Sequence, residues 1–179
     1  MQVNNNYSPN FGMALRIAPK AKSKLQQQSL EYLTKLRNAG EELKGHKYVD
    51  LDISETLSPV VNRRGCANAY KDCFKPINVT NRGVEVETRW AGNNVSGIQY
   101  GDTYKTYLKF ASEEEAQSAY NALQEAGKKS HFDSALEFTK LVEKAEIYKA
   151  EVEAEKAAHQ AKVNAEVDKL LSDFPDVDA

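Results

Sequence analysis

The feature that most constrains this sequence is a long interval without a helix breaker. No glycine or proline occurs between Gly127 and Pro175, so residues 128–174 form 47 consecutive positions free of both. Helices in globular proteins average about 11–12 residues, so a helix that fills this interval is exceptional in length. Ser130 and Asp133 offer caps for its first turn. The sequence therefore predicts a long C-terminal helix that begins near His131.

Apolar residues follow this helix as two stripes. The first stripe alternates steps of three and four residues, the spacing of a helical face that packs against another surface. It consists of Phe138, Leu141, Ala145, Tyr148 and Val152. The second stripe resumes eleven residues after Val152 and consists of Val163, Val167, Leu170 and Phe174, widened by Leu171. Eleven residues are almost a whole number of turns, so both stripes lie on nearly one face.

The polar interval between the stripes leaves two structures open. A straight helix over residues 131–172 is roughly 60 Å long, and its second stripe cannot reach the core on which the first stripe packs. A break near residues 157–161 would instead fold the helix back as a hairpin. The interval is rich in Ala, Glu and Lys, which have high helix propensity, and this favours the continuous helix.

The second stripe is the predicted partner-binding surface. The charged pairs Lys162–Glu166 and Lys169–Asp173 run in the less favourable order along a helix and add at most a few tenths of a kcal/mol each. Packing must therefore stabilise this end of the helix, against a protein partner or a second copy of the chain. The predicted partner-binding residues are Val163, Val167, Leu170, Leu171 and Phe174.

The rest of the chain indicates an α+β fold. We expect an antiparallel sheet of four to five strands, with helices on one face, ahead of the long helix. This divides the chain into a flexible N-terminal arm (1–10), an α+β domain (11–127), the long helix (128–174, docked, projecting or hairpinned) and a tail (175–179).

Alternating apolar residues mark the expected strands. One lies at 11–17, and a second at 49–53 places Asp50 and Asp52 on an exposed face. A hairpin follows, turned by residues 81–83, and a strand rich in Tyr and Thr covers 98–110. Residues 55–76 show no clear period and are predicted to form a loop with one helical turn near 67–74.

Two further helices are expected before the long one. Residues 20–43 have a helical apolar pattern that Gly45 ends. The run Ser112-Glu113-Glu114-Glu115 has the form of a capping box, in which the Ser oxygen accepts an amide and Glu115 reaches back. This helix is expected to end at Gly127.

The run from Tyr107 to Ala116, continued by Ala119, Tyr120 and Leu123, resembles the third strand and second helix of an RNA-recognition motif. The resemblance covers about a tenth of the chain and implies a strand that feeds a capped helix. Lys105 stands where that family has a stacking aromatic residue, and a long helix follows where its fourth strand belongs. We therefore infer no membership of the family.

A loosely basic region suggests a second function, the binding of nucleic acid. Basic residues interleaved with aromatic ones offer charge for phosphates and rings for bases. The candidate residues are Arg63, Arg64, Lys71 and Lys75, within a basic region over 63–89. We expect Arg63 and Arg64 to lie on an exposed loop. The nearby Trp90 continues the apolar face of a hairpin strand and is expected in the core.

No catalytic set stands out, so a small enzyme with an unrecognised site is the third hypothesis. The histidines are far apart in sequence, and Cys66 and Cys73 lack a metal-binding spacing. Asp50 and Asp52 could act as a carboxylate pair, but alternation on a half-exposed strand explains them equally. We predict no catalytic residue, no metal and no cofactor.

Composition sets the compartment that we expect. Hydrophobic residues make up 41% of the chain, the formal net charge is −2, and no apolar run approaches the roughly 20 residues of a membrane span. The first ten residues are uncharged and Asn-rich, unlike a signal peptide. We therefore expect a cytoplasmic protein without a membrane partner.

Overall fold

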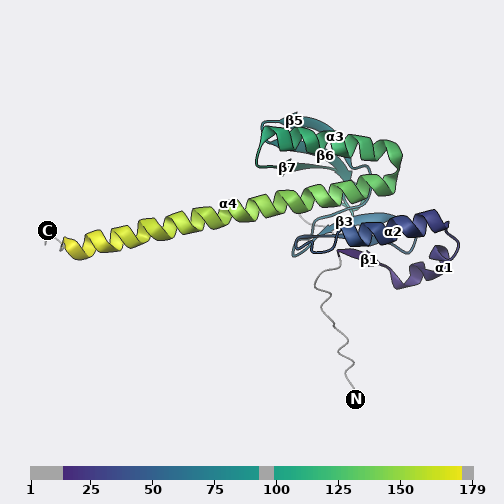
Figure 1. The fold of residues 1–179 in the computed structure, drawn as a ribbon, viewed down its shortest axis with the longest axis horizontal. Coiled ribbons are helices and arrows are strands. Elements are labelled where there is room, and N and C mark those ends of the chain that lie inside the picture. The colour runs from purple at the N-terminus through teal and green to yellow at the C-terminus, as the bar shows by residue number, and fades with distance from the viewer. Residues whose placement is uncertain (1–13, 93–98, 175–179) are drawn as a thin grey trace, which may run out of the picture.

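The computed structural model describes residues 14–92 and 99–174 and contains two small sheets and one very long helix (Figure 1). The strands are β1 (Leu15–Ile17), β2 (Val49–Ile53), β3 (Pro59–Arg63), β4 (Ala69–Tyr70), β5 (Lys75–Thr80), β6 (Gly83–Arg89) and β7 (Thr103–Lys109). The helices are the 3₁₀ turn η1 (Pro19–Ala21), α1 (Lys22–Leu25), α2 (Leu30–Glu42), α3 (Glu113–Lys129) and α4 (His131–Asp173). The predicted α+β class and the long C-terminal helix are confirmed.

The first sheet is mixed, so the prediction of one antiparallel sheet is wrong. Its strand order is β1-β2-β3-β4, with β1 parallel to β2 and the other pairs antiparallel. The chain passes through three helical segments between β1 and β2, and a long crossover of this kind joins parallel strands. Strands β3 and β4 lie where we predicted a loop. The prediction failed because Pro59 suggested a break, although proline is tolerated at the first residue of a strand, and because β4 is too short to show a period.

The second sheet is antiparallel with the order β5-β6-β7. The predicted hairpin is confirmed: Thr80 pairs with Gly83 across a turn in which Asn81 has a φ of 51°, a left-handed conformation that Asn tolerates. Strand β7 starts at Thr103. The strand predicted from residue 98 is therefore too long, because residues 99–102 form a turn and not a strand. Residue 98 itself lies outside the described residues, as do Phe11 and Met13 of the first predicted strand, the N-terminal segment 1–10 and the tail at 175–179.

The two sheets are joined where β4 meets the end of β6. Tyr70 forms an isolated bridge with Trp90, the Lys71 amide donates to the Arg89 carbonyl at 3.0 Å, and the Ala91 amide donates to the Ala69 carbonyl at 2.8 Å. The Trp90 side chain is 2% exposed and its ring lies 6.0 Å from that of Tyr104. The prediction that Trp90 belongs to the core is confirmed.

The helical segment predicted at 20–43 is interrupted. Helix α1 ends at Leu25, and α2 begins at Leu30 after Ser29 caps it by accepting the Tyr32 amide at 3.2 Å. Serine favours a cap over a helix interior because its hydroxyl competes for backbone groups. The apolar spacing continues across the interruption between α1 and α2, so the spacing alone predicts one helix.

Helix α3 begins as predicted, with the Ser112 hydroxyl accepting the Glu115 amide at 3.1 Å. The predicted second half of the capping box, in which the Glu115 carboxylate reaches back toward Ser112, is replaced by an ion pair between Glu115 and Lys144 of α4 at 3.5 Å. The predicted end at Gly127 is wrong by two residues: α3 continues to Lys129, and Ser130 then caps α4 by accepting the Asp133 amide at 3.0 Å.

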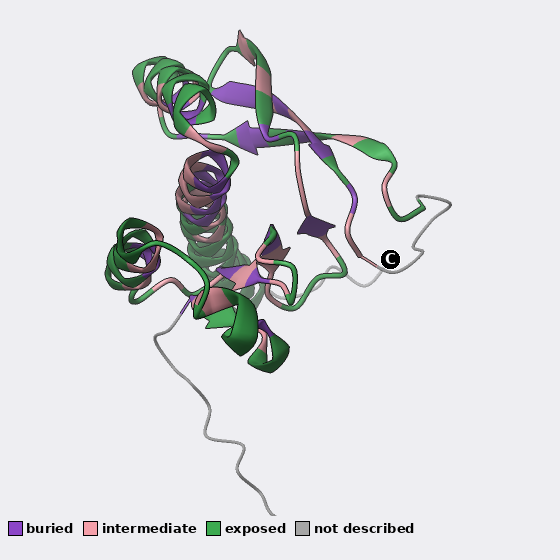
Figure 2. Cartoon of the chain, turned by 90° about the vertical axis from the view of Figure 1, so that its right-hand side faces the viewer, coloured by how far each residue is buried: buried purple, intermediate pink, exposed green. Residues whose placement is uncertain are grey.

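Helix α4 is unbroken over its 43 residues, so it does not fold back as a hairpin. Its first half passes between the two sheets beside α3, and Figure 2, which looks along it, shows buried residues where these layers face one another. Phe138 and Leu141 of the first stripe lie in the core, and Tyr148 and Val152 are half-buried. Every residue from Glu153 to Phe174 is exposed. We call this projecting segment, residues 153–174, the arm, and the rest of the described chain the body.

Candidate functional site

The predicted partner-binding residues form an uncovered apolar stripe on the arm. Their exposure rises outward from 40% at Val163 to 70% at Phe174. The members are Val163, Val167, Leu170, Leu171 and Phe174. Eleven residues turn a helix by about 20° more than three full turns, so the stripe points to the same side of α4 as Val152. It therefore lies on the side where the body packs, but beyond the reach of the body (Figure 1).

One flank of this stripe alternates in charge. At about 100° per residue, four charged residues fall on the same side of the stripe within one narrow sector. They are Lys162, Glu166, Lys169 and Asp173. The signs read positive, negative, positive, negative along the helix, so the flank carries no net charge.

The part of α4 that lies within the body, which we call its root, is held to the first sheet by a buried carboxylate. Glu143 is 4% exposed and accepts the backbone amides of Lys47 at 2.5 Å and Tyr48 at 2.9 Å. Three residues further on, Glu146 pairs with Arg63 at the end of β3. The direction in which the arm leaves the body is therefore set by polar contacts as well as by the apolar core.

A histidine lies beside the buried carboxylate. Burial lowers the pKa of His46, and the nearby Arg64 lowers it further, whereas the charge of Glu143 raises it. Burial dominates, so the imidazole is held toward its neutral form. The hydrogen bond from Arg64 to Asp50 raises the pKa of the guanidinium, which stays charged.

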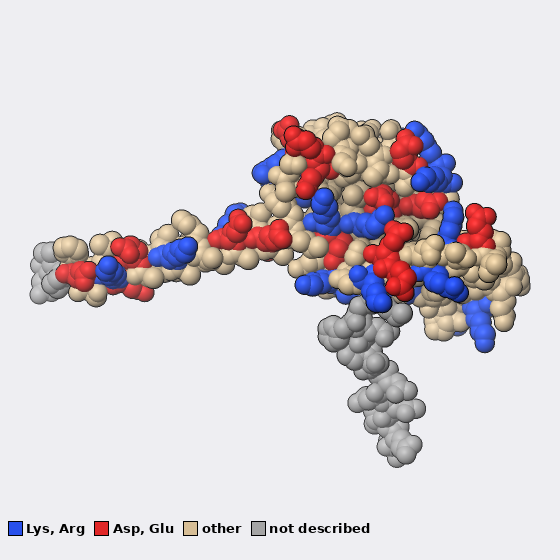
Figure 3. Space-filling model, in the orientation of Figure 1, with Lys and Arg blue, Asp and Glu red and all other residues tan. Residues whose placement is uncertain are grey.

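The basic residues predicted to bind nucleic acid do not form one free surface. Arg63 ends β3 and is paired with Glu146, so the expectation of an exposed loop is wrong for it. Arg64 is half-buried and donates to Asp50 at 2.5 Å. Lys71 lies over the Tyr100 ring at 4.0 Å, and Lys75 is exposed at the start of β5. Figure 3 shows Lys and Arg interspersed with Asp and Glu on the face in view.

The predicted exposed acidic face of β2 is also wrong in part. Asp50 is buried and paired with Arg64, and Arg16 of β1 makes two hydrogen bonds to Asp52, at 2.6 and 2.7 Å. The parallel pairing of β1 with β2 brings this arginine opposite Asp52. The two carboxylates are therefore engaged in ion pairs, and a role in acid–base chemistry has no support from their surroundings.

The cysteines are free and exposed. Burial raises the pKa of the Cys73 thiol, and the neighbouring Glu87 raises it further. A nucleophilic cysteine needs the opposite shift. Within residues 14–92 and 99–174, no group of three His, Cys, Asp or Glu is placed to hold a metal ion.

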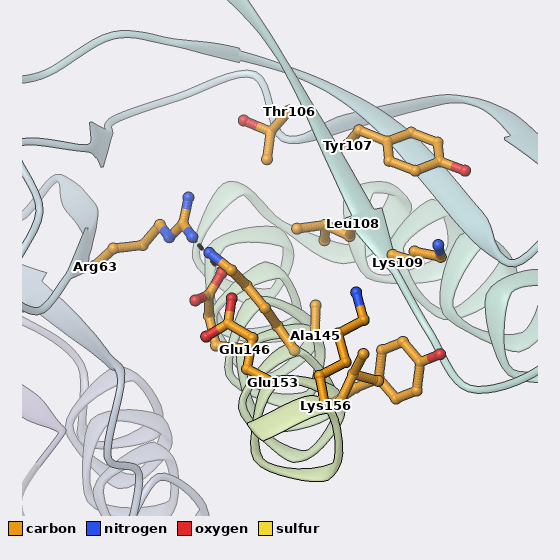
Figure 4. A pocket seen from close by; sticks show the side chains of 12 residues that line it. Arg63, Thr106, Tyr107, Leu108, Lys109, Ala145, Glu146, Glu153 and Lys156 are labelled. Atoms are coloured by element: carbon orange, nitrogen blue, oxygen red, sulfur yellow. Dashed lines mark hydrogen bonds and ion pairs between the residues drawn. The ribbon is translucent and has the colours of Figure 1, made fainter. Parts of the chain in front are cut away.

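A groove with a volume of about 340 Å³ lies where α4 leaves the body (Figure 4). Residues 106–109 of β7 form one wall, a face of α4 between Ala145 and Lys156 forms the other, and Arg63 stands at one end. We call it the β7–α4 groove. Its walls are about 40 residues apart in the sequence, so no local pattern could have indicated it.

Three buried polar atoms lie close together at and behind this groove. They are Arg63 Nε, Tyr70 Oη and Thr106 Oγ1, of which Arg63 and Thr106 belong to residues that line the groove. Burial raises the pKa of Tyr70, while its neighbours Thr106 and Arg63 act in the opposite direction. Buried polar groups are normally satisfied, and here Tyr70 interacts with both Thr106 and Arg63.

Comparisons with known proteins give no relative for this chain. No protein-family model, curated protein or solved structure matches it. None of the helices in the described part of the chain is both long and apolar enough to cross a bilayer.

Proposed function

We propose that the protein is a non-enzymatic interaction or scaffold protein that pairs with a second copy of itself through the arm. The observation that carries this proposal is the apolar stripe on a helix that projects away from its own core. Isolated apolar residues are common on protein surfaces, but five on one exposed helical face mark an interaction surface.

The charged flank favours a second copy over an unrelated partner. When two arms pair antiparallel, Lys162 lies opposite Asp173 of the second copy, and Glu166 lies opposite Lys169. Because the flank has four charges of alternating sign, its order of signs is opposite when the helix is reversed, so each charge meets one of opposite sign on an antiparallel copy. A shift of two residues, about 3 Å along the axis, which long charged side chains can span, places Val167 against Leu170 and Val163 against Phe174, the pairing of core positions in an antiparallel coiled coil. Such an interface is isologous and closes as a dimer.

The position of the body also supports the antiparallel arrangement. The first stripe packs into the body, and the stripe of the arm points to that same side of α4. Two parallel helices that share this face would bring both bodies into the same space between them. Antiparallel arms instead carry the bodies at opposite ends of the paired segment.

The expected affinity is modest. Burying the exposed parts of ten apolar side chains contributes about 10 kcal/mol, at roughly 1 kcal/mol for each half-exposed residue. Association and side-chain ordering cost at least about 4 kcal/mol, which leaves at most about 6 kcal/mol. The pairing is therefore expected to be reversible, with a dissociation constant of about 40 μM or weaker.

Sedimentation equilibrium of the full chain over a range of concentrations tests the proposal. We expect a monomer–dimer equilibrium that V167K/L170K abolishes, because two lysines enter the stripe. The matched control is A161K/A165K, which places the same charges on the opposite side of the arm and keeps the dimer. Charge reversal gives a second test: K162E weakens the dimer, and K162E/D173K restores it.

Spin labels distinguish the arrangement of the dimer. In a background of C66S/C73S, a label at A157C is separated from its copy by about 35 Å in the antiparallel register, against about 10 Å in a parallel pair. A full chain that stays monomeric at every concentration tested would refute self-pairing. A loss of body stability in V167K/L170K would show that the stripe belongs to the core.

A further inference from the structure

The β7–α4 groove follows the edge of a strand and not one of its faces. Side chains of successive strand residues point to opposite faces, so a cavity over one face meets alternate residues only. The four consecutive residues 106–109 all line this groove. In Figure 4, Thr106 and Leu108 point to one side of β7 and Tyr107 and Lys109 to the other. The groove therefore runs along the backbone edge of β7, the outer strand of its sheet within the described residues.

The alternation of hydrogen bonds along β7 shows which of its backbone groups face the groove. The Phe110 amide donates to the Arg82 carbonyl at 2.7 Å, which makes this a hydrogen-bonded position of the β6–β7 ladder. Such positions alternate along antiparallel strands. Thr106 and Leu108 therefore bond to β6, whereas the amides and carbonyls of Lys105, Tyr107 and Lys109 point away from β6. These outward groups are the template on which a further strand adds.

Helix α4 supplies the opposite wall. The lining residues recur at helical spacing from Ala145 to Lys156, so one face of the helix looks into the groove. Eleven residues of helix are about 16 Å long, the length of about five residues of extended chain. Ala145 and Val152 give this wall an apolar centre, and Leu108 faces it from β7. The buried Thr106 hydroxyl, which is a neighbour of Tyr70, also lines the groove.

The groove carries an excess of positive charge. Four basic residues line it against the two carboxylates of Glu146 and Glu153, which leaves two positive charges in excess. The basic residues are Arg63, Lys109, Lys149 and Lys156. Arg63 and Glu146 neutralise each other, so the excess lies on the lysines. Lysines on an edge strand repel a basic strand and attract an acidic one.

We propose that the β7–α4 groove binds an extended acidic peptide segment of another protein, which adds to β7 as a fourth strand of the second sheet. Backbone hydrogen bonds to Lys105, Tyr107 and Lys109 hold it. Its inward side chain packs on the apolar centre between Leu108 and α4, and its carboxylates meet the lysines. This mode of recognition takes affinity from the main chain and specificity from alternate side chains.

The test is a titration of the full-length protein with acetyl-Asp-Val-Asp-Ile-Asp-amide, followed by amide chemical shifts and hydrogen exchange. Saturation is expected to protect the amides of Lys105, Tyr107 and Lys109 from exchange. Y107P removes one edge donor and is expected to weaken binding by about tenfold or more, since proline cannot donate to a ladder. Y107A keeps the amide but loses the hydrogen bond from the Tyr107 hydroxyl to the Thr80 carbonyl, so the amount by which Y107P binds more weakly than Y107A measures the backbone donor alone.

Charge and ligand controls complete the experiment. K149E/K156E is expected to weaken binding by about tenfold, whereas K128E/K129E on α3 leaves it unchanged. Equal binding of acetyl-Lys-Val-Lys-Ile-Lys-amide would overturn the acidic specificity. Equal shifts with inorganic phosphate would overturn the peptide in favour of a small-anion site. Binding without protection of the three edge amides would overturn strand addition, and this readout does not depend on whether Y107P folds.

Discussion

Removal of the Glu143 carboxylate is the sharpest test of how the root of α4 is fixed. This side chain is almost fully buried and accepts the amides of Lys47 and Tyr48, just before β2. Hydrogen bonds to a charged group contribute about 1.5–3 kcal/mol each, so two of them amount to about 3–6 kcal/mol. Relief of the cost of burying the carboxylate offsets part of this. We therefore expect E143A to lower the free energy of unfolding by about 3 kcal/mol.

The glutamine substitution makes this expectation specific. E143Q keeps one acceptor oxygen but presents an NH₂ group to the second amide, so it should retain about half of the effect. Urea unfolding followed by the fluorescence of Trp90, the single tryptophan, measures both variants. With a slope of about 2 kcal/mol/M, the midpoint of E143A should fall by about 1.5 M.

The exposed Glu151 on the same helix provides the matched control, and E151A should stay within about 0.5 kcal/mol of the unchanged protein. Two results would contradict this account of Glu143. One is an E143A variant whose stability lies within about 1 kcal/mol of the unchanged protein. The other is an E143Q variant as unstable as E143A, because loss of charge rather than loss of an acceptor would then be the cause.

Three further predictions concern the body. W90A should cost about 3–5 kcal/mol of unfolding free energy in calorimetry, because Trp90 is buried at the junction of the sheets; a cost under about 1 kcal/mol would contradict this. The lowered pKa of His46 means that the unfolded chain gains a proton near pH 6.5 before the native protein does, so stability should fall as the pH drops below about 6.5. This slope should flatten in H46Q, and an unchanged slope would exclude His46 as its source. R64A leaves the buried Asp50 with less compensation and should cost about 1–2 kcal/mol in urea unfolding, unlike a neutral surface change.

The elements that the sequence predicts correctly are those with local causes. The stripes of α4 follow from helical spacing, the Ser112 and Ser130 caps from short-range hydrogen bonds, and the β5–β6 hairpin from the residues of its turn. The second stripe could be recognised as a candidate site for the same reason. Its exposure depends on the continuity of α4, which high helix propensity in the middle segment favoured.

The failures have non-local causes. The pairing of Arg63 with Glu146 joins residues 83 positions apart, and the bond from Tyr48 to Glu143 spans 95. A basic residue in an unpatterned segment looks solvent-exposed when its acidic partner is that distant. The parallel β1–β2 pair depends on a crossover through three helical segments, and the β7–α4 groove depends on how β7 and α4 pack once each has formed. Neither leaves a period in the sequence.

In the arm, the residues that favour a helix and the residues that form the apolar stripe lie on different sides. Nucleation is the costly step of helix formation, and the buried root of α4 has already formed a nucleus from which the arm only propagates. Alanine, which recurs on the side of the arm opposite the stripe, supports propagation better than valine or phenylalanine does. Val163, Val167 and Phe174 are therefore poor choices for helicity alone, and their presence on one face supports the proposed contact with a second copy. Substitutions there should leave the body intact and act on association alone.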